Sequence, residues 1–218
     1  DYAFSSCINI EKIKLPDSVQ YFGRRAFSYC TKLSEINIPI SWNSTSSSGG
    51  IFAECEGLTS ITIPEGLTKL PNYAFSGCTY LKEIILPDTL TSIGDKAFSG
   101  CTGLTEITLP DILTGIGDNA FYGCTGLTKI TLPDTLTSIG DYAFYGCTGV
   151  VEISLPSTLT NIGSYAFKGC TSLESISLPS GITTINSYTF SDCTGLTEIY
   201  LPDTLTSIGD KAFSGCTG

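Results

Sequence analysis

The sequence contains no histidine and no methionine, and charged residues make up only 15% of it. Without histidine, the Ser-His-Asp and Cys-His arrangements of nucleophilic catalysis are excluded, and so is the commonest general base. The sequence also lacks a P-loop and a G-x-G-x-x-G motif, so it contains no recognisable nucleotide-binding motif. We therefore expect a protein that is not an enzyme and that carries no cofactor and no metal site.

Basic residues are scarce as well. Eleven lysines and arginines stand against 21 acidic residues, which gives a formal net charge of −10. Nucleic-acid binding depends on clustered basic side chains, and no such cluster is present. No apolar run approaches the length of a membrane span, so we expect neither a nucleic-acid partner nor membrane insertion. The chain starts at Asp1 inside a repeat, which indicates a fragment of a longer protein.

The ten cysteines recur at a nearly constant interval. Successive cysteines are 23 residues apart, except that Cys30 and Cys55 are separated by 25. Disulfide scaffolds have irregular spacings, and zinc sites use closely spaced C-x2-C pairs. A fixed period of 20 to 50 residues instead indicates a repeat architecture. We expect one small buried thiol in each coil; disulfides between neighbouring coils and a redox or metal role are the alternatives.

One coil, residues 95–117, reads DKAFSGCTGLTEITLPDILTGIG. Within its L-x-x-I-x-L register, Ile107 and Leu109 are expected to point inward from one strand. Pro110 ends that strand because it cannot donate to a continuing ladder. Asp118 stands where an N-cap would begin a short helical turn. The phenylalanine and cysteine of that turn are expected to return to the core.

The same register repeats along the whole chain. Phenylalanine occupies one column in every coil, and residues 86–103 recur letter for letter as residues 201–218. A single coil cannot bury its apolar face, but a stack of coils buries a continuous core. Residues 1–218 therefore predict one solenoid of about nine and a half coils with no linker. The irregular coil, around residues 38–55, is the exception to the pattern.

The pattern L-T-x-I-G-x-x-A-F-x-x-C-x-x-L-x-x-I-x-L-P resembles the BspA-like (Treponema-type) leucine-rich repeats of bacterial surface proteins, over the whole chain. The resemblance implies a right-handed leucine-rich-repeat superhelix with a parallel β-sheet on its concave side. Short helical or 3-10 turns and short strands are expected on the other sides. The family also implies a secreted or cell-surface location and binding to host proteins or other cells. It supplies no catalytic residues.

Two outward columns of the predicted strands are candidates for partner binding on the concave side. They contain four glutamates, one lysine and one tyrosine that we single out: Glu83, Glu106, Glu152, Glu198, Lys129 and Tyr200. The alternative is an ordinary solvated face. A cation between Glu83 and Glu106 is disfavoured because calcium needs six to eight oxygen ligands.

Two further features are candidates for contact with a partner. Tyr142, Tyr165 and Tyr188 occupy one convex column in three successive coils. Stacked tyrosines form an adhesive patch for protein or sugar, or else they lie flat over the convex turn. The irregular coil holds the only tryptophan, Trp42. This tryptophan is either the anchor of a binding loop or a cover for the gap that an insertion leaves.

These observations predict a non-enzymatic interaction module of a bacterial cell-surface or secreted protein that acts in adhesion. It would bind a protein or glycan ligand on host or neighbouring cells through the concave face or the irregular third coil. A passive stalk that presents another domain is the alternative. Open ends of the stack also predict end-to-end self-association.

Overall fold

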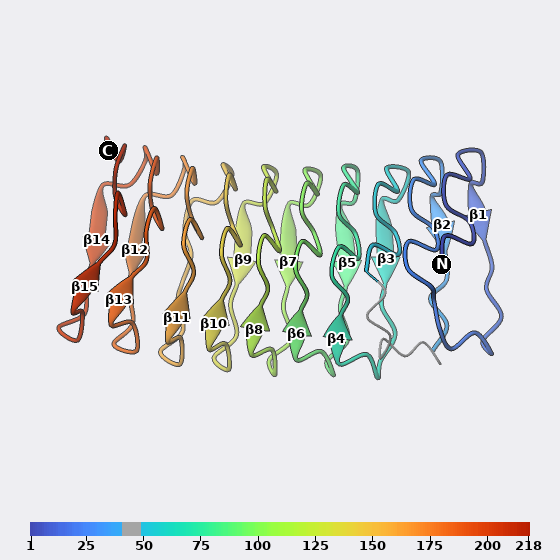
Figure 1. Ribbon diagram of the computed structural model, residues 1–218, viewed down its shortest axis with the longest axis horizontal. Coiled ribbons are helices and arrows are strands. Elements are labelled where there is room, and N and C mark those ends of the chain that lie inside the picture. Colours follow the sequence, from blue (N-terminus) through green and yellow to red (C-terminus); the bar gives the residue numbers. More distant parts are fainter. Residues whose placement is uncertain (41–48) are drawn as a thin grey trace.

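The computed structural model describes residues 1–40 and 49–218. The chain forms a solenoid of parallel strands with about eight turns. Successive coils stack along the long axis, from the N-terminal coils at one end to the C-terminal coils at the other (Figure 1). The predicted parallel-strand solenoid is thus confirmed.

Most of the described coils contribute to two rows of short strands. The first row is the sheet expected on the concave side, which we call the concave sheet. It comprises β1 (Lys12–Ile13), β2 (Glu35–Ile36), β3 (Ser60–Thr62), β5 (Glu83–Ile85), β7 (Glu106–Thr108), β9 (Lys129–Thr131), β12 (Ser175–Ser177) and β14 (Glu198–Tyr200). The second row comprises β4 (Lys69–Leu70), β6 (Ser92–Ile93), β8 (Gly115–Ile116), β10 (Ser138–Ile139), β11 (Asn161–Ile162), β13 (Thr184–Ile185) and β15 (Ser207–Ile208).

The register of the concave sheet follows from the alternation along each strand. In β7, Ile107 points into the core and is only 5% exposed, whereas Glu106 and Thr108 are exposed. Ile107 pairs with Ile130 of β9, so isoleucine lies beside isoleucine from coil to coil. A slip of one residue would turn every isoleucine outward, which fixes the outward columns predicted from the sequence.

Phenylalanine rings form the centre of the core. The rings from Phe4 to Phe213 stack coil upon coil, with centroids 5.1–5.9 Å apart. Phe52 of the irregular coil keeps its place in this stack, 5.6 Å from Phe27 and 5.5 Å from Phe75. The irregular coil therefore leaves the central stack continuous.

The cysteine column lies beside the phenylalanine stack. All ten cysteines are free thiols, and those from Cys30 to Cys193 are buried. Each of these buried thiols donates a hydrogen bond to a phenylalanine carbonyl of a preceding coil, as Cys124 does to Phe98 at 3.0 Å. The predicted ladder of packed thiols is confirmed, and the disulfide alternative is wrong.

The expected helical turns are wrong: no helix occurs in the part of the chain that the structure describes. After Asp118 the backbone enters the left-handed region at Asn119, where φ is 55°. The Phe121 N–H then donates to the carbonyl of Ala143 in the next coil, at 2.7 Å, instead of to a carbonyl of its own turn. This left-handed residue prevents a right-handed helix from forming.

Asp118 is correspondingly not a helix cap. One of its carboxylate oxygens accepts a hydrogen bond from the backbone N–H of Asp141, 2.9 Å away in the next coil. Asp95 accepts from the N–H of Asp118 in the same way, at 3.1 Å, and Asp141 accepts from Ser164 at 2.7 Å. The recurring aspartate therefore links successive coils.

Candidate interaction surfaces

The concave sheet is hydrogen-bonded only in pairs of strands. Within the described residues, its named strands pair as β1–β2, β3–β5, β7–β9 and β12–β14, and a single bridge joins Glu152 to Ser175. Between the pairs the strands run side by side without a ladder. Two of the three cavities described below lie at such interruptions, between β2 and β3 and between β5 and β7.

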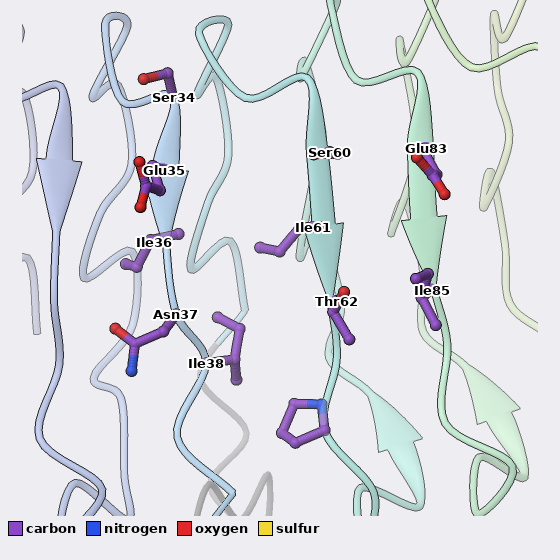
Figure 2. A pocket seen from close by; sticks show the side chains of 11 residues that line it. Ser34, Glu35, Ile36, Asn37, Ile38, Ser60, Ile61, Thr62, Glu83 and Ile85 are labelled. Carbon is purple, nitrogen blue, oxygen red and sulfur yellow. The ribbon is translucent and has the colours of Figure 1, made fainter.

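Three cavities lie along the described part of the concave sheet. The first, about 430 Å³, lies over β2, β3 and β5. Figure 2 shows Glu35 and Asn37 on one side of it and Thr62, Glu83 and Ile85 on the other. The second, about 760 Å³, lies over the interruption between β5 and β7. The third, about 350 Å³, includes residues of β12 and reaches Tyr200 of β14.

The predicted acidic residues are distributed among these cavities. Glu83 and Glu106 line the same 760 Å³ cavity, together with Lys82. Glu152 and Tyr200 line the 350 Å³ cavity. The structure therefore brings Glu83 together with Glu106, and Glu152 together with Tyr200, but it spreads the whole set along the solenoid.

The two remaining predicted residues of the concave sheet have neighbours on their own or adjacent strands. Lys129 of β9 stands opposite Glu106 of β7 in the parallel register. Glu198 lies two residues before Tyr200 on β14, and a hydrogen bond between their side chains raises the pKa of Tyr200. An ion pair forms farther along the sheet, between Lys12 and Glu35 at 2.6 Å.

No group of three or more His, Cys, Asp or Glu side chains is arranged to hold a metal ion among residues 1–40 and 49–218. The same residues form no helix that is long and apolar enough to cross a membrane.

The convex tyrosines form a stack. Tyr142 and Tyr165 lie with their ring centroids 4.5 Å apart, and Tyr165 and Tyr188 lie 4.6 Å apart. Tyr122 and Tyr145 stack beside them at 4.8 Å. We call these five residues the tyrosine stack. The facing sides of neighbouring rings cover one another, whereas Tyr122 has a stacked ring on one side only. Desolvation raises the pKa of Tyr142.

Lys168 lies against the tyrosine stack, a contact that sequence reasoning missed. Its ammonium is 5.5 Å from the ring centroid of Tyr188 and 2.8 Å from a carboxylate oxygen of Asp192. The hydrogen bond to Asp192 raises the pKa of Lys168, and the same contact lowers the pKa of Asp192. The stack is therefore flanked by a fixed, paired charge.

A second surface was also missed. A cavity of about 480 Å³, which we call the turn-face trough, extends over five coils and ends at Tyr122 of the tyrosine stack. Its charged and aromatic lining residues are Arg25, Tyr29, Glu54, Tyr73, Lys96 and Tyr122. The sequence contained one signal: the position after the core phenylalanine is small at Ala53, Ser76 and Ser99, and it is tyrosine in the next two coils, at Tyr122 and Tyr145. This change of size along one column opens the trough.

The remaining candidate, Trp42, lies outside the described residues. The described flanks of the irregular coil are nevertheless ordered into the stack, because Ile51 and Phe52 are both buried.

Comparisons with known proteins agree with this architecture. No curated protein matches the chain in sequence. Among solved structures, the T. pallidum leucine-rich repeat protein TpLRR is similar, with 36% identity over 73% of this chain and 77% of that chain and a TM-score of 0.70. A leucine-rich cell surface protein of Faecalibacterium prausnitzii shows 29% identity over 99% of this chain and 73% of that chain, with a TM-score of 0.57.

The pneumococcal vaccine antigen PcpA shares the fold alone, with 21% identity over 93% of this chain and 57% of that chain and a TM-score of 0.51. The model of the BspA type leucine-rich repeat region matches six copies, over residues 1–128 and 114–218. Proteins built from such repeats are generally non-catalytic scaffolds for protein interaction. The chain belongs to the BspA-type leucine-rich-repeat family.

Proposed function

We propose that this chain is a non-enzymatic adhesion module of a bacterial cell-surface or secreted protein, and that it binds a protein of a host or neighbouring cell through the concave sheet. The observation that carries the proposal is the series of three cavities along that sheet, of about 430, 760 and 350 Å³. Each is open to the outward columns in which the coils differ.

The chemistry of these columns indicates the kind of partner surface. Glutamates alternate with hydroxyl side chains, and large apolar side chains are exposed among them: Ile85 is 52% exposed and Tyr200 is 55% exposed. An exposed apolar side chain within a charged rim is typical of an interaction surface. The net charge of −10 favours a basic partner, which electrostatic attraction would steer to the sheet.

A surface location is part of the proposal. One similar structure is that of a leucine-rich cell surface protein of Faecalibacterium prausnitzii. The family resemblance and that neighbour support the same location for this chain.

A passive stalk is the second candidate. The letter-for-letter repeat of residues 86–103 at 201–218 favours it, because a spacer needs only copies of one coil. The two functions differ in whether the outward columns matter.

The test is a charge reversal on the concave sheet. We would immobilise extracellular-matrix proteins, mucins and epithelial cells and measure binding of the wild-type chain and of the variant E83K/E106K/E152K. All three glutamates are exposed, so the variant should fold normally. An adhesion module should show saturable binding that the variant loses.

The matched control is D134K/E174K/D203K, which changes the net charge equally at exposed positions outside β5, β7 and the bridge residue Glu152. Equal binding by wild type and both variants, or no binding by any of them, would favour the stalk. Equal loss in both variants would show a net-charge effect and would contradict a site on the concave sheet.

A further inference from the structure

We propose that the turn-face trough is a second binding site, for a saccharide that carries a carboxylate group. The trough lies on the turns and ends at Tyr122 of the tyrosine stack, and its lining shares no residue with the three cavities of the concave sheet. Its volume of about 480 Å³ falls within the range of about 300–1,000 Å³ that is typical of small-molecule clefts.

Unpaired charge is the first argument. Among the described residues, the ion pairs are Lys12–Glu35 and Lys168–Asp192, so Arg25, Glu54 and Lys96 have no ion-pair partner at the trough. The ammonium of Lys96 lies 5.4 Å from the ring centroid of Tyr73, a contact that leaves its positive charge uncompensated by a carboxylate. Two cations and one anion leave an excess of one positive charge, in a molecule whose net charge is −10. A ligand carboxylate would complement this local excess, because the planar guanidinium of arginine matches a carboxylate in a bidentate pair.

Open aromatic faces are the second argument. Tyr122 stacks on Tyr145 on one side, with the ring centroids 4.8 Å apart, and it contacts no other ring among the described residues. The side chain of Tyr122 is 39% exposed. Tyr29, which also lines the trough, is 45% exposed. The C–H face of a pyranose ring packs on an exposed aromatic face of this kind, and the tyrosine hydroxyl remains available for hydrogen bonds.

Small polar side chains supply the remaining contacts. Ser76, Ser99 and Asn119 line the trough between the rings. Hydroxyl and amide groups both donate and accept hydrogen bonds, as the hydroxyls of a sugar do. The carboxylate of Glu54, which lies over Gly77, adds an acceptor for further hydroxyls.

The backbone argues against an extended peptide as the occupant. Along this face the N–H of Tyr73 donates to Asp95 at 2.7 Å, and the N–H of Gly77 donates to Ser99 at 2.7 Å. The next coil repeats the pattern, for example from Gly100 to Tyr122 at 2.7 Å. Because these groups are used between coils, the trough offers no free strand edge for β-augmentation. Recognition must come from side chains.

The experiment compares acidic saccharides with matched neutral ones. Sialyllactose is measured against lactose, and a hyaluronan tetrasaccharide against chitotetraose, by calorimetric titration of the whole chain. We expect at least one acidic saccharide to bind saturably and its neutral counterpart to bind at least about tenfold more weakly, a loss of the size that a charge-assisted pair supplies. Binding of one acidic saccharide but not the other identifies sialic acid or a uronic acid as the source of the carboxylate.

Variants locate the binding. R25Q and Y122A should each weaken it at least about tenfold. The matched controls are R24Q and Y80A. Arg24 lies over the ring of Tyr2, Tyr80 is exposed, and neither residue lines the trough. No saturable binding of either acidic saccharide, equal binding of neutral sugars, or equal loss in R24Q and R25Q would overturn the proposal. The glutamate variant of the concave sheet should bind the saccharide normally, so the two proposed sites fail or succeed separately.

Discussion

The cysteine of each coil serves as a hydrogen-bond donor within an apolar environment. The carbonyl of Phe98 accepts two bonds: one from the N–H of Cys101 at 3.0 Å and one from the thiol of Cys124 at 3.0 Å. Both lone pairs of this carbonyl are therefore used. An alanine at the cysteine position would fill the space less well and would leave one acceptor site empty. The regular spacing of cysteine thus reflects a packing requirement, repeated once per coil.

Burial of the thiols predicts that the fold is lost at alkaline pH. Burial raises the pKa of Cys55, Cys124 and Cys193 to about 12, from an ordinary value of 9.0. The unfolded chain releases these protons near pH 9, whereas the folded chain retains them. Their contribution to stability is therefore complete below about pH 9 and decreases as the pH rises towards about 12. Urea midpoints measured at pH 7, 9 and 10.5, as chosen test points, should fall in that order.

Cys124→Ser provides the matched comparison, because a serine hydroxyl does not titrate in this range and retains a donor for Phe98. Its urea midpoint should fall less steeply between pH 9 and 10.5 than that of the wild type. Parallel pH profiles for the two proteins would contradict the assignment of the alkaline loss to thiols.

Gly115 and Gly117 lie two residues apart, but only Gly117 is in such close contact with the neighbouring coil that a side chain has no room. A Cβ at Gly117 would lie 2.6 Å from a carboxylate oxygen of Asp95 and 2.8 Å from its backbone nitrogen. A Cβ at Gly115, in β8, would meet only the hydroxyl of Ser138, at 3.4 Å. Gly117→Ala should therefore destabilise the protein by about 1–3 kcal/mol through overpacking.

Gly115→Ala should cost nothing and should add up to about 1 kcal/mol, because alanine restricts the unfolded chain. Urea denaturation of the two variants gives both free energies of unfolding and tests this difference. Equal effects of the two substitutions would show that the close approach at Gly117 does not set the spacing of the coils.

At the scale of the element, the sequence predicted what depends on period and alternation. The inward isoleucines, the phenylalanine stack and the outward glutamates all follow from a repeat of 23 residues and a strand period of two. The helical turn was predicted wrongly because Asp118 and its neighbours resemble a capping signal. Only the partner coil reveals that the carboxylate bonds to Asp141. Hydrogen bonds between coils have no local signature.

The candidate sites were predictable to a lesser degree. The outward columns of the concave sheet were identified, but the interruptions that hollow the sheet were not. Glu83 of β5 and Glu106 of β7 carry like charges in one column, whereas Glu106 stands opposite Lys129 of β9, and only the second pair of strands is hydrogen-bonded. The turn-face trough was missed because its lining comes from five coils, from Arg25 to Tyr122. Its shape depends on side-chain sizes in several columns at once.

At the scale of the whole molecule, the solenoid is a one-dimensional stack. Each coil contacts its neighbours, so stability is approximately a sum of coil terms and interfaces between adjacent coils. The phenylalanine stack runs through nearly every interface, and Phe121 has a ring on each side, at 5.3 Å from Phe98 and 5.2 Å from Phe144. Phe4 has one stacked ring, Phe27 at 5.1 Å, and is 40% exposed.

This difference predicts that position along the stack determines the cost of removing a ring. Phe121→Ala should destabilise the protein by about 3–5 kcal/mol, the usual cost of truncating a fully buried phenylalanine. Phe4→Ala should cost clearly less, because its ring is already partly in water and supports one interface. Denaturant unfolding of both variants gives the two free energies. Hydrogen exchange should show that Phe121→Ala weakens protection first at the amides of Phe98 and Phe121, whose bonds cross the two affected interfaces. Equal costs at the two positions, or a loss of protection spread evenly over all coils, would contradict a stack held together by contacts between adjacent coils.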